Sequence, residues 1–277
     1  MSQDERPLVL ELFLYNPATQ KAVIIYFPGN VWSKIESLNR FDKIDVLYNS
    51  KNIKPLVEKI EKLTDLSIPF YIDIQLDNLA KLVDLLGGLE LFIPNPINIE
   101  YQARRILIQS GSVLLDGDKL SDYLLIQSDE EGVLRKHEFF KSFLKKITAP
   151  QTISYLFKAQ AFDYLIALLK TNLSSKEIQS FIEEISELNV ETIIFTRVRG
   201  ELKVQENGEK ILYPLKQGEY LKLTIIQLID LLAKTEAISQ EDINLTLEVL
   251  NGTDIPKRAA NTAGIFRRYG YNIHSIW

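Results

Sequence analysis

Cysteine is absent from the 277-residue sequence, and histidine occurs only twice. Without a thiol, the chain can form no disulfide, no thiolate metal site and no cysteine nucleophile. His137 and His274 each stand without a second ligand at metal-binding spacing, so no zinc site is expected. The lack of cysteine is compatible with an oxidising compartment but does not identify one.

An excess of positive charge is also missing. The chain has 32 Lys and Arg against 37 Asp and Glu, a net charge of -5. Binding of a phosphate backbone requires a basic field, so no nucleic-acid partner is expected. No run of residues reaches the roughly 18 to 20 apolar positions of a membrane span, and the opening MSQDERP lacks the order of a signal peptide. As given, the sequence predicts a soluble chain.

Several catalytic motifs are missing as well. There is no Gly-rich phosphate loop of either common spacing and no Gly-x-Ser-x-Gly nucleophile elbow. Carboxylate pairs such as Glu183-Glu184 fall on an exposed helix face and carry no catalytic pattern. What the chain does have is 46% hydrophobic and 25% charged residues, which is typical of a globular protein with one large domain and a small one.

Strand and helix patterns alternate along the chain. LVLELFLYNPATQKAVIIYFP predicts two strands around an Asn-Pro turn, and NIKPLVEKIEKLTDL predicts an amphipathic helix. VLRKHEFFKSFLKKI predicts a second amphipathic helix. The residues expected on its buried side are Leu134, Phe139 or Phe140, Phe143, Leu144 and Ile147. RVRGELK places three cations at alternating positions of one strand, which is typical of a solvated face. Strands that alternate with helices predict a layered α/β domain.

The stretch KLVDLLGGLELFIP, residues 81–94, joins a helix directly to a strand. Its apolar residues repeat at helical spacing up to Gly87-Gly88, and then alternate as in a strand. A left-handed residue at a helix end is most often glycine, so the pair is expected to form the cap and the turn.

The last 33 residues are expected to form a separate small unit. Residues 245–277 predict strand, Asn-Gly turn, helix and strand, a βαβ unit too small to bury a core alone. The polar segment 235–244 is expected to be a linker, which leaves residues 1–234 as the main domain. The small unit is expected to dock on the main domain or on a protein partner.

These segments, in this order, resemble the LytR-CpsA-Psr family, and LTLEVLNGTDIPKRAANTAGIFRRYGYNIHSIW resembles the small LytR C-terminal domain. The resemblance implies a three-layer α/β/α domain with a central mixed sheet. It also implies an extracytoplasmic, membrane-anchored cell-envelope protein that transfers glycopolymers from polyprenyl pyrophosphate to peptidoglycan. An apolar core would hold the prenyl tail, and arginines and aspartates would hold the pyrophosphate with Mg²⁺.

The resemblance implies phosphate-handling positions that this chain fills differently. The family's Pro-Arg-Asp motif reads Pro28-Gly29-Asn30 here, so an arginine is replaced by Gly29 and an aspartate by Asn30. Its paired arginines fall on Leu125 and Gln127. Each lost charged partner of a buried anion commonly costs about 2 to 5 kcal/mol of binding. The sequence therefore predicts that the fold is kept without the diphosphate clamp.

Two further family positions also differ. The metal-binding aspartate ahead of the first strand falls near Leu8, and the expected Arg-Gln pair reads Glu138-Phe139. Arg135 is the one arginine that still matches the family, after the acidic loop SDEEG. It is the catalytic candidate only if the protein is active, and the alternative role is a salt bridge to that loop. No resident metal is expected, and Mg²⁺ would be needed only by an active transferase.

The joint at Gly87-Gly88 is expected to form one wall of the family's apolar pocket. The residues that would line it are Leu79, Leu82, Val83, Leu86, Leu89 and Leu91.

Three functions follow from these expectations. The favoured one is a non-catalytic envelope protein that binds a lipid-linked glycan, peptidoglycan or a protein partner. The second is an active glycopolymer transferase with a rearranged charge cluster. The third is an assembly scaffold with a closed pocket that makes contacts through residues 245–277.

Overall fold

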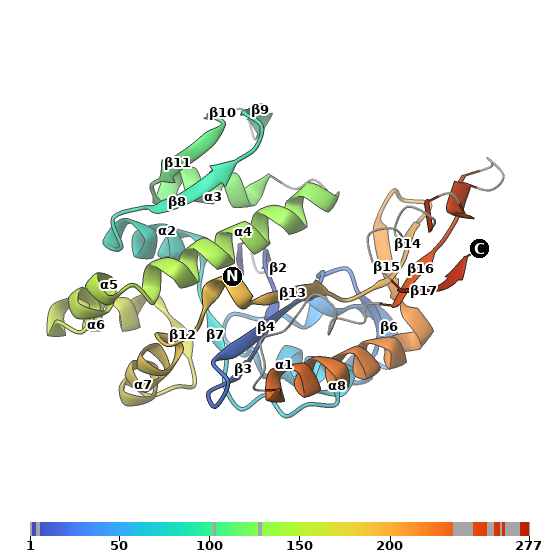
Figure 1. The fold of residues 1–277 in the computed structure, drawn as a ribbon, viewed down its shortest axis with the longest axis horizontal. Helices are drawn as coiled ribbons and strands as arrows, with labels where there is room; N and C mark the ends of the chain where they lie inside the picture. Colours follow the sequence, from blue (N-terminus) through green and yellow to red (C-terminus); the bar gives the residue numbers. More distant parts are fainter. Residues whose placement is uncertain are drawn as a thin grey trace. The chain divides into compact units, whose positions relative to one another are not determined.

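The computed structural model describes residues 2–3, 6–101, 104–126, 129–234, 246–253, 258–260, 262–263 and 272–276. The chain divides into two compact units, Met1–Leu232 and Ala233–Trp277. In the larger unit, helices cover both faces of a mixed sheet (Figure 1). This arrangement confirms the predicted three-layer α/β/α architecture. The expected linker 235–244 lies outside the described residues, so the domain boundaries stay a prediction.

The central sheet has the strand order β13-β4-β3. β3 (Glu11–Asn16) and β4 (Lys21–Tyr26) form the predicted antiparallel hairpin. Its turn is held by the Asn16 side chain, whose Oδ1 accepts a hydrogen bond from the Ala18 amide at 3.0 Å. β13 (Ile194–Arg197) comes from far along the chain and pairs with β4 in parallel. The sheet is therefore mixed, as predicted.

Strand β4 is buried on both faces, because successive side chains of a strand point to opposite sides. Ala22 and Ile24 belong to one hydrophobic core, and Val23, Ile25 and Phe27 belong to the other. This explains the continuous apolar run of the sequence in place of an alternating one.

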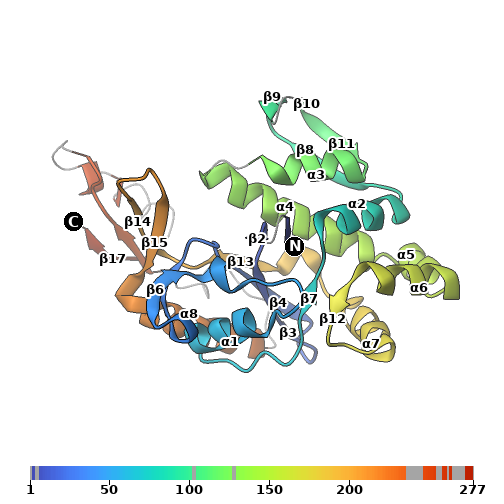
Figure 2. The same cartoon turned by 180° about the vertical axis from the view of Figure 1, so that it is seen from behind.

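Each core is completed by its own helices. The first core includes residues of α2 (Leu76–Leu85), α3 (Gly117–Leu125) and α4 (Asp129–Ile147). The second includes residues of α1 (Lys54–Thr64) and α8 (Glu219–Ala233). Figures 1 and 2 show these two groups on opposite sides of β3 and β4. The sheet thus has one face that meets α4 and one that meets α1 and α8.

The helix-to-strand joint has the predicted form. α2 starts at Leu76 and ends before Gly87 and Gly88, whose φ angles of 77° and 87° favour glycine. The Gly88 amide donates to the Val83 carbonyl at 2.9 Å, which satisfies a carbonyl of the last helical turn. β8 (Leu89–Ile93) follows at once, with its alternate residues buried, and pairs with β11 (Gly111–Leu115).

The remaining elements surround this body. The helices are α5 (Pro150–Leu156), α6 (Ala159–Leu168) and α7 (Ser175–Ile185), with 3-10 turns η1 (Glu36–Leu38), η2 (Ile44–Leu47), η3 (Val190–Thr192) and η4 (Leu215–Gly218). The strands are β1 (Ser2–Gln3), β2 (Arg6–Pro7), β5 (Trp32–Ile35), β6 (Arg40–Lys43), β7 (Ile72–Asp73), β9 (Ile97–Tyr101), β10 (Arg104–Ile108), β12 (Lys170–Thr171), β14 (Gly200–Val204) and β15 (Lys210–Pro214).

The smaller unit contains β16 (Thr246–Val249) and β17 (Asn272–Ile276), which pair in parallel. Between them in sequence, residues 258–260 and 262–263 are helical. Val249, Ala259 and Ala263 form its buried apolar cluster. Parallel strands with a helix between them match the expected βαβ order.

Two sequence predictions are wrong in detail. Leu134 was expected on the buried side of α4 but is 63% exposed, because it shares a side of the helix with His137 and Lys141 and not with the core residue Phe139. RVRGELK is not one strand, since β13 ends at Arg197 and β14 begins at Gly200. Among the described residues, none of the helices has the length and apolarity needed to span a membrane.

Candidate functional site

A row of polar side chains crosses the sheet at the carboxyl ends of its parallel strands. Tyr26 ends β4 and is paired with Arg197, which ends β13, and with Glu11, which begins β3. Residues paired across neighbouring strands share one face of a sheet. Tyr26 lies two residues after Ile24, so the row lies on the face covered by α4. The carboxyl ends of parallel strands are where α/β sheets commonly bind ligands.

Helix α4 adds a buried lysine to this row. Lys136 is three residues before the core residue Phe139, so it lies on the inner side of the helix. Its Nζ donates a hydrogen bond to the Tyr26 hydroxyl at 2.9 Å and lies 4.7 Å from the centre of the Tyr26 ring. Burial lowers the pKa of Lys136 to about 8, although the Glu11 charge opposes that change.

Glu11 places a carboxyl group in the interior of the row. Both of its carboxylate oxygens are buried and accept no hydrogen bond. Burial raises the pKa of Glu11 to about 8, against the attraction of the Lys136 charge. Burial and the Glu11 charge also raise the pKa of Tyr26 to about 12. At neutral pH the site therefore favours a protonated Glu11 next to a charged Lys136.

Arg135 points toward the end of α3. Its Nη2 donates to the carbonyl of Ile126 at 2.8 Å, and its guanidinium carbon lies 5.9 Å from the centre of the Tyr123 ring. Burial raises the pKa of Tyr123 to about 12. Arg135 thus ties α4 to the C-terminal end of α3.

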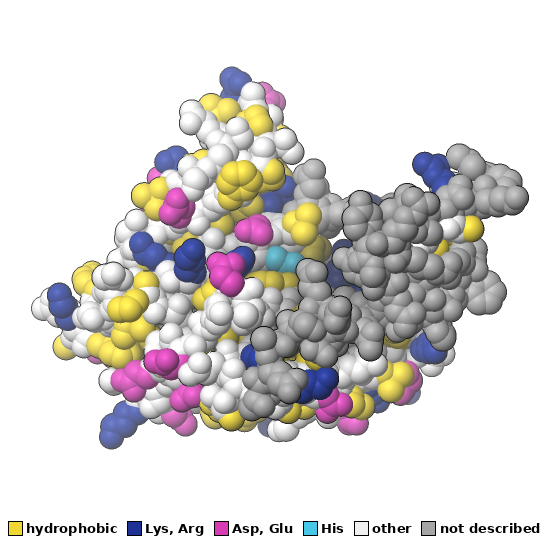
Figure 3. Space-filling model, viewed as in Figure 1, with side chains coloured by type: hydrophobic (Ala, Val, Ile, Leu, Met, Phe, Trp, Pro, Cys, Tyr) yellow, Lys and Arg dark blue, Asp and Glu magenta, His cyan; other side chains and the backbone are white. Residues whose placement is uncertain are grey.

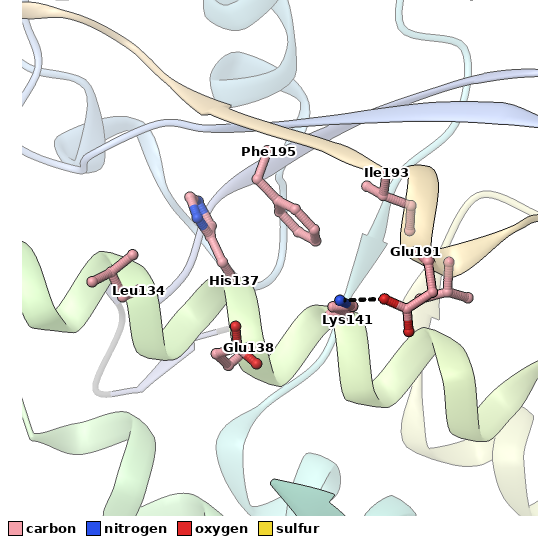
Figure 4. Close-up of a pocket in the computed structure, with 8 residues that line it drawn as sticks. Leu134, His137, Glu138, Lys141, Glu191, Ile193 and Phe195 are labelled. Carbon is pink, nitrogen blue, oxygen red and sulfur yellow. Dashed lines mark ion pairs between the residues drawn. The ribbon is translucent and has the colours of Figure 1, made fainter. Parts of the chain in front are cut away.

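A small pocket of about 210 Å³ lies beside His137, the residue that follows Lys136 in α4. Its walls come from α4 and from the segment that leads into β13 (Figure 4), and they consist of Leu134, His137, Glu138, Lys141, Val190, Glu191, Ile193 and Phe195. The Lys141 ammonium pairs with the Glu191 carboxylate at 2.6 Å across the pocket. The rings of His137 and Phe195 lie 4.9 Å apart. On this face of the molecule, Figure 3 shows a histidine at the surface among acidic, basic and apolar side chains.

His137 supplies an unused polar atom. Its Nε2 is buried and has no hydrogen-bond partner. Burial lowers the pKa of His137, and the nearby charges of Arg197 and Lys136 lower it further. The lowered pKa favours the neutral imidazole at pH 7. Its Nε2 can then donate or accept one hydrogen bond with a bound molecule.

The Gly29-Asn30 segment is used inside the fold. The Asn30 Nδ2 donates to the Lys210 carbonyl at 2.9 Å, and the Asn30 carbonyl accepts from the Leu212 amide at 3.0 Å. A Cβ placed on Gly29 would lie 3.2 Å from the Cβ of Asp45, so the loop packs closely against that residue. This segment ties β15 to the end of β4.

The expected pocket wall is found in the interior. Its six residues all belong to the first core and are at most 7% exposed, and they are Leu79, Leu82, Val83, Leu86, Leu89 and Leu91. Leu8 and Leu125 belong to the same core. Gln127 lies outside the described residues. Their ligand-binding role stays a prediction.

Mg²⁺ prefers several oxygen ligands, mainly carboxylates. Within the part of the chain that the structure describes, no three His, Asp or Glu side chains gather where they could hold an ion. Asp45 has one buried oxygen without a hydrogen bond, but it is a single carboxylate next to Gly29. These residues do not fit a resident Mg²⁺ site.

Four residues of the site were not found from the sequence: Glu11, Tyr26, Lys136 and Arg197. The signal for Glu11 is its position on a strand, where it shares a face with the aromatic residues Phe13 and Tyr15. The signal for Lys136 is its helical spacing to Phe139. Arg197 is exposed, as expected for a solvated strand face, yet it flanks the paired Tyr26.

Comparison with solved structures agrees with this fold. TagV of B. subtilis superimposes with a TM-score of 0.71 at 16% identity, covering 82% of this chain and 91% of TagV. The structure titled "TagT bound to LI-WTA" has a TM-score of 0.62 at 15% identity, covering 79% of this chain and 83% of that one. At these identities the likeness shows the fold alone.

The LytR_cpsA_psr family matches residues 8–227. The chain therefore belongs to the LytR-CpsA-Psr family. Similar curated proteins include the "Probable cell wall biosynthesis protein LcpB" of Corynebacterium glutamicum, 26% identical over 51% of this chain and 34% of that protein. Another is the "Polyisoprenyl-teichoic acid--peptidoglycan teichoic acid transferase TagU" of Bacillus mycoides, 23% identical over 61% of this chain and 55% of TagU. The matches span about a third of LcpB and about half of TagU.

Proposed function

We propose that this chain is a non-catalytic cell-envelope protein that binds a polyprenyl-linked glycan or peptidoglycan at the end of its central sheet. The names of its relatives support an envelope role, because they refer to cell wall biosynthesis and to transfer of polyisoprenyl-linked teichoic acid. The proposal includes an extracytoplasmic, membrane-attached location, and a protein contact through residues 245–277.

One observation carries the non-catalytic part of the proposal. Gly29 and Asn30 stand where the family resemblance implies an arginine and an aspartate, and both residues are used to pack the loop against Asp45 and β15. A developing diphosphate charge requires several cations that point at it. No side chain of this loop supplies one.

The binding part rests on the polar row and the adjoining pocket. Lys136 and Arg197 place positive charge at the carboxyl ends of β4 and β13, and His137 offers a hydrogen-bonding atom beside an aromatic ring. Glu138 and the Lys141–Glu191 pair line the outer side with polar atoms. Such a mixture suits a ligand that carries one phosphate charge and hydroxyl groups.

The experiment is a binding titration with a polyprenyl-phosphate-linked glycan, in wild type and in Lys136→Met. We expect the substitution to weaken binding about tenfold or more, because the ligand loses a charged partner. Lys145→Met, at an exposed position of the same helix, is the matched control and should bind as wild type. Equal affinity of wild type and Lys136→Met would contradict the proposed site.

A second candidate, an active transferase with rearranged charges, has one observation in its favour. Lys136 and Arg197 are two cations at the site, and neither stands at a position where the family resemblance implies a charged residue. A third, a scaffold with a closed pocket, is favoured by the burial of the expected pocket wall. Lipid that copurifies with the protein would support the binding proposal. If no lipid copurifies and the glycan titration detects no binding, the result would support the scaffold.

A further inference from the structure

Strand β14 is an edge strand with an unusual distribution of charge. It forms a two-stranded ladder with β15, in which Leu202 is paired with Leu212. The far side of β15 meets the loop after β4, through the pairing of Val31 with Leu212. Among the described residues, β14 therefore has a strand neighbour on one side only. Leu202 and Val204 are 48% and 65% exposed.

The backbone groups of β14 that face away from β15 can be identified from the hydrogen bonds at both ends of the ladder. The Gln205 amide donates to the Glu209 carbonyl at 2.8 Å, and the Leu215 amide donates to the Arg199 carbonyl at 3.1 Å. In an antiparallel pair, alternate residues exchange hydrogen bonds, so the odd-numbered residues of β14 bond to β15. The amides and carbonyls of Gly200, Leu202 and Val204 point outward.

We propose that β14 pairs with β14 of a second copy of this chain, antiparallel and centred on Leu202. A two-fold axis at Leu202 places Gly200 opposite Val204 of the other copy, and Leu202 opposite its own equivalent. All three outward-facing residues then form hydrogen-bonded pairs, with no outward amide or carbonyl of the strand left over. The contact is isologous, so it closes at a dimer and does not propagate.

The side chains of β14 fit this pairing on the charged face. Glu201 and Lys203 lie on one face and form an ion pair of 3.3 Å within the strand. About the same axis, Glu201 of each copy lies directly opposite Lys203 of the other. Opposite charges at paired positions stabilise antiparallel strands, and like charges would destabilise them. The strand is thus complementary to itself in charge.

The apolar face fits as well. Leu202 is paired with Leu212 inside one copy, and with the second Leu202 across the axis, so four leucines would form one continuous row. On the charged face, the Lys203 ammonium lies 5.2 Å from the centre of the Tyr213 ring of β15. Exposed edge strands are usually protected against pairing by charges of one sign, prolines or bulges. The alternating signs on β14 instead match those of a second β14.

The test is sedimentation velocity on the full chain, with charge-exchange variants. We expect wild type to form a dimer whose fraction rises with protein concentration. Glu201→Lys and Lys203→Glu each place like charges at both cross-strand positions, so each should raise the dimer dissociation constant about tenfold or more. An equimolar mixture of the two single variants should form a heterodimer, and the double variant should dimerise as wild type does.

A backbone variant tests the hydrogen bonding. Leu202→Pro removes an outward-facing amide and leaves the bonds to β15 in place, so it should abolish the dimer at unchanged helix content. Leu202→Ala keeps that amide and should retain a weaker dimer. A monomeric wild type at several hundred micromolar would overturn the proposal, and would point to residues 233–277 or another protein as the partner of β14. Single variants that dimerise as wild type does would overturn it too.

Discussion

Replacement of Glu11 by glutamine tests the electrostatics of the buried site. Both carboxylate oxygens are buried without a hydrogen bond, and burial raises the pKa of this group from 4.5 to about 8. The folded state therefore binds a proton more tightly than the unfolded state between these two pH values. By linkage, the free energy of unfolding must fall as the pH rises from about 5 to 8.

The size of this effect follows from the pKa change. A pKa change from 4.5 to about 8 corresponds to about 5 kcal/mol if the carboxylate is buried without any relaxation. Relaxation and water entry reduce the penalty of a buried charge, so we expect a loss of about 2 kcal/mol. Burial also lowers the pKa of Lys136 from 10.5 to about 8, and this effect has the opposite sign at higher pH. The decline should therefore stop near pH 8 and reverse above it.

Urea unfolding at a series of pH values measures this profile. Glu11→Gln has no carboxyl to titrate, so it should match wild type at pH 5 and exceed it by about 2 kcal/mol at pH 8. Glu206→Gln removes an exposed carboxyl and should keep the wild-type decline. A wild-type stability that is flat between pH 5 and 8 would refute the reasoning. So would a Glu11→Gln variant that declines in the same way.

Two further predictions concern the fold around the site. Asn30→Asp introduces the residue type that the family resemblance implies, but it turns an amide donor into an oxygen that faces the Lys210 carbonyl, so it should destabilise the fold in urea unfolding more than Asn30→Ala, which should cost about 1 kcal/mol. An Asn30→Asp variant as stable as wild type would show that this hydrogen bond does not hold β15. Leu82→Ala should cost about 2 to 5 kcal/mol because the residue is buried in the first core, whereas Leu134→Ala, at an exposed position, should cost less than about 0.5 kcal/mol. Similar losses for these two leucine variants would contradict the placement of Leu82 in the core and of Leu134 on the exposed side of α4.

The main secondary-structure elements could be predicted from the sequence because the patterns that indicate them are local. The hairpin around Asn16, the joint at Gly87-Gly88 and the parallel unit at the end of the chain each depend on turn residues and on apolar spacing within a short segment. No local pattern indicates the long-range pairing of β13 with β4, and the family resemblance implied only that the central sheet is mixed.

The polar site could not be predicted in the same way. Glu11 and Lys136 are separated by more than a hundred residues, so the spacing of each to apolar neighbours in its own element does not show that the two charges meet. Their burial depends on how α4 packs over the sheet, which only the tertiary structure determines. The side of α4 that carries Leu134 was misjudged for a related reason. An amphipathic helix with apolar residues on two sides has no unique buried face in its sequence.

The structural role of Gly29-Asn30 could also not be predicted from the sequence. The family resemblance implies charged residues at these positions, but it does not tell what Gly29 and Asn30 do in their place. In the structure, Asn30 bonds to the backbone of β15 and Gly29 permits close packing on Asp45. A loop that is built into the fold in this way is the main reason to propose binding without transfer.

The measurement that tests this claim most directly is a transfer assay with a labelled polyprenyl-pyrophosphate glycan and peptidoglycan as the acceptor. The proposed function predicts that the wild-type protein binds the labelled donor and that no label moves to peptidoglycan and no polyprenyl phosphate is released. Sustained transfer of label by wild type, lost in Lys136→Met or Arg135→Ala and kept in Lys145→Met, would contradict it.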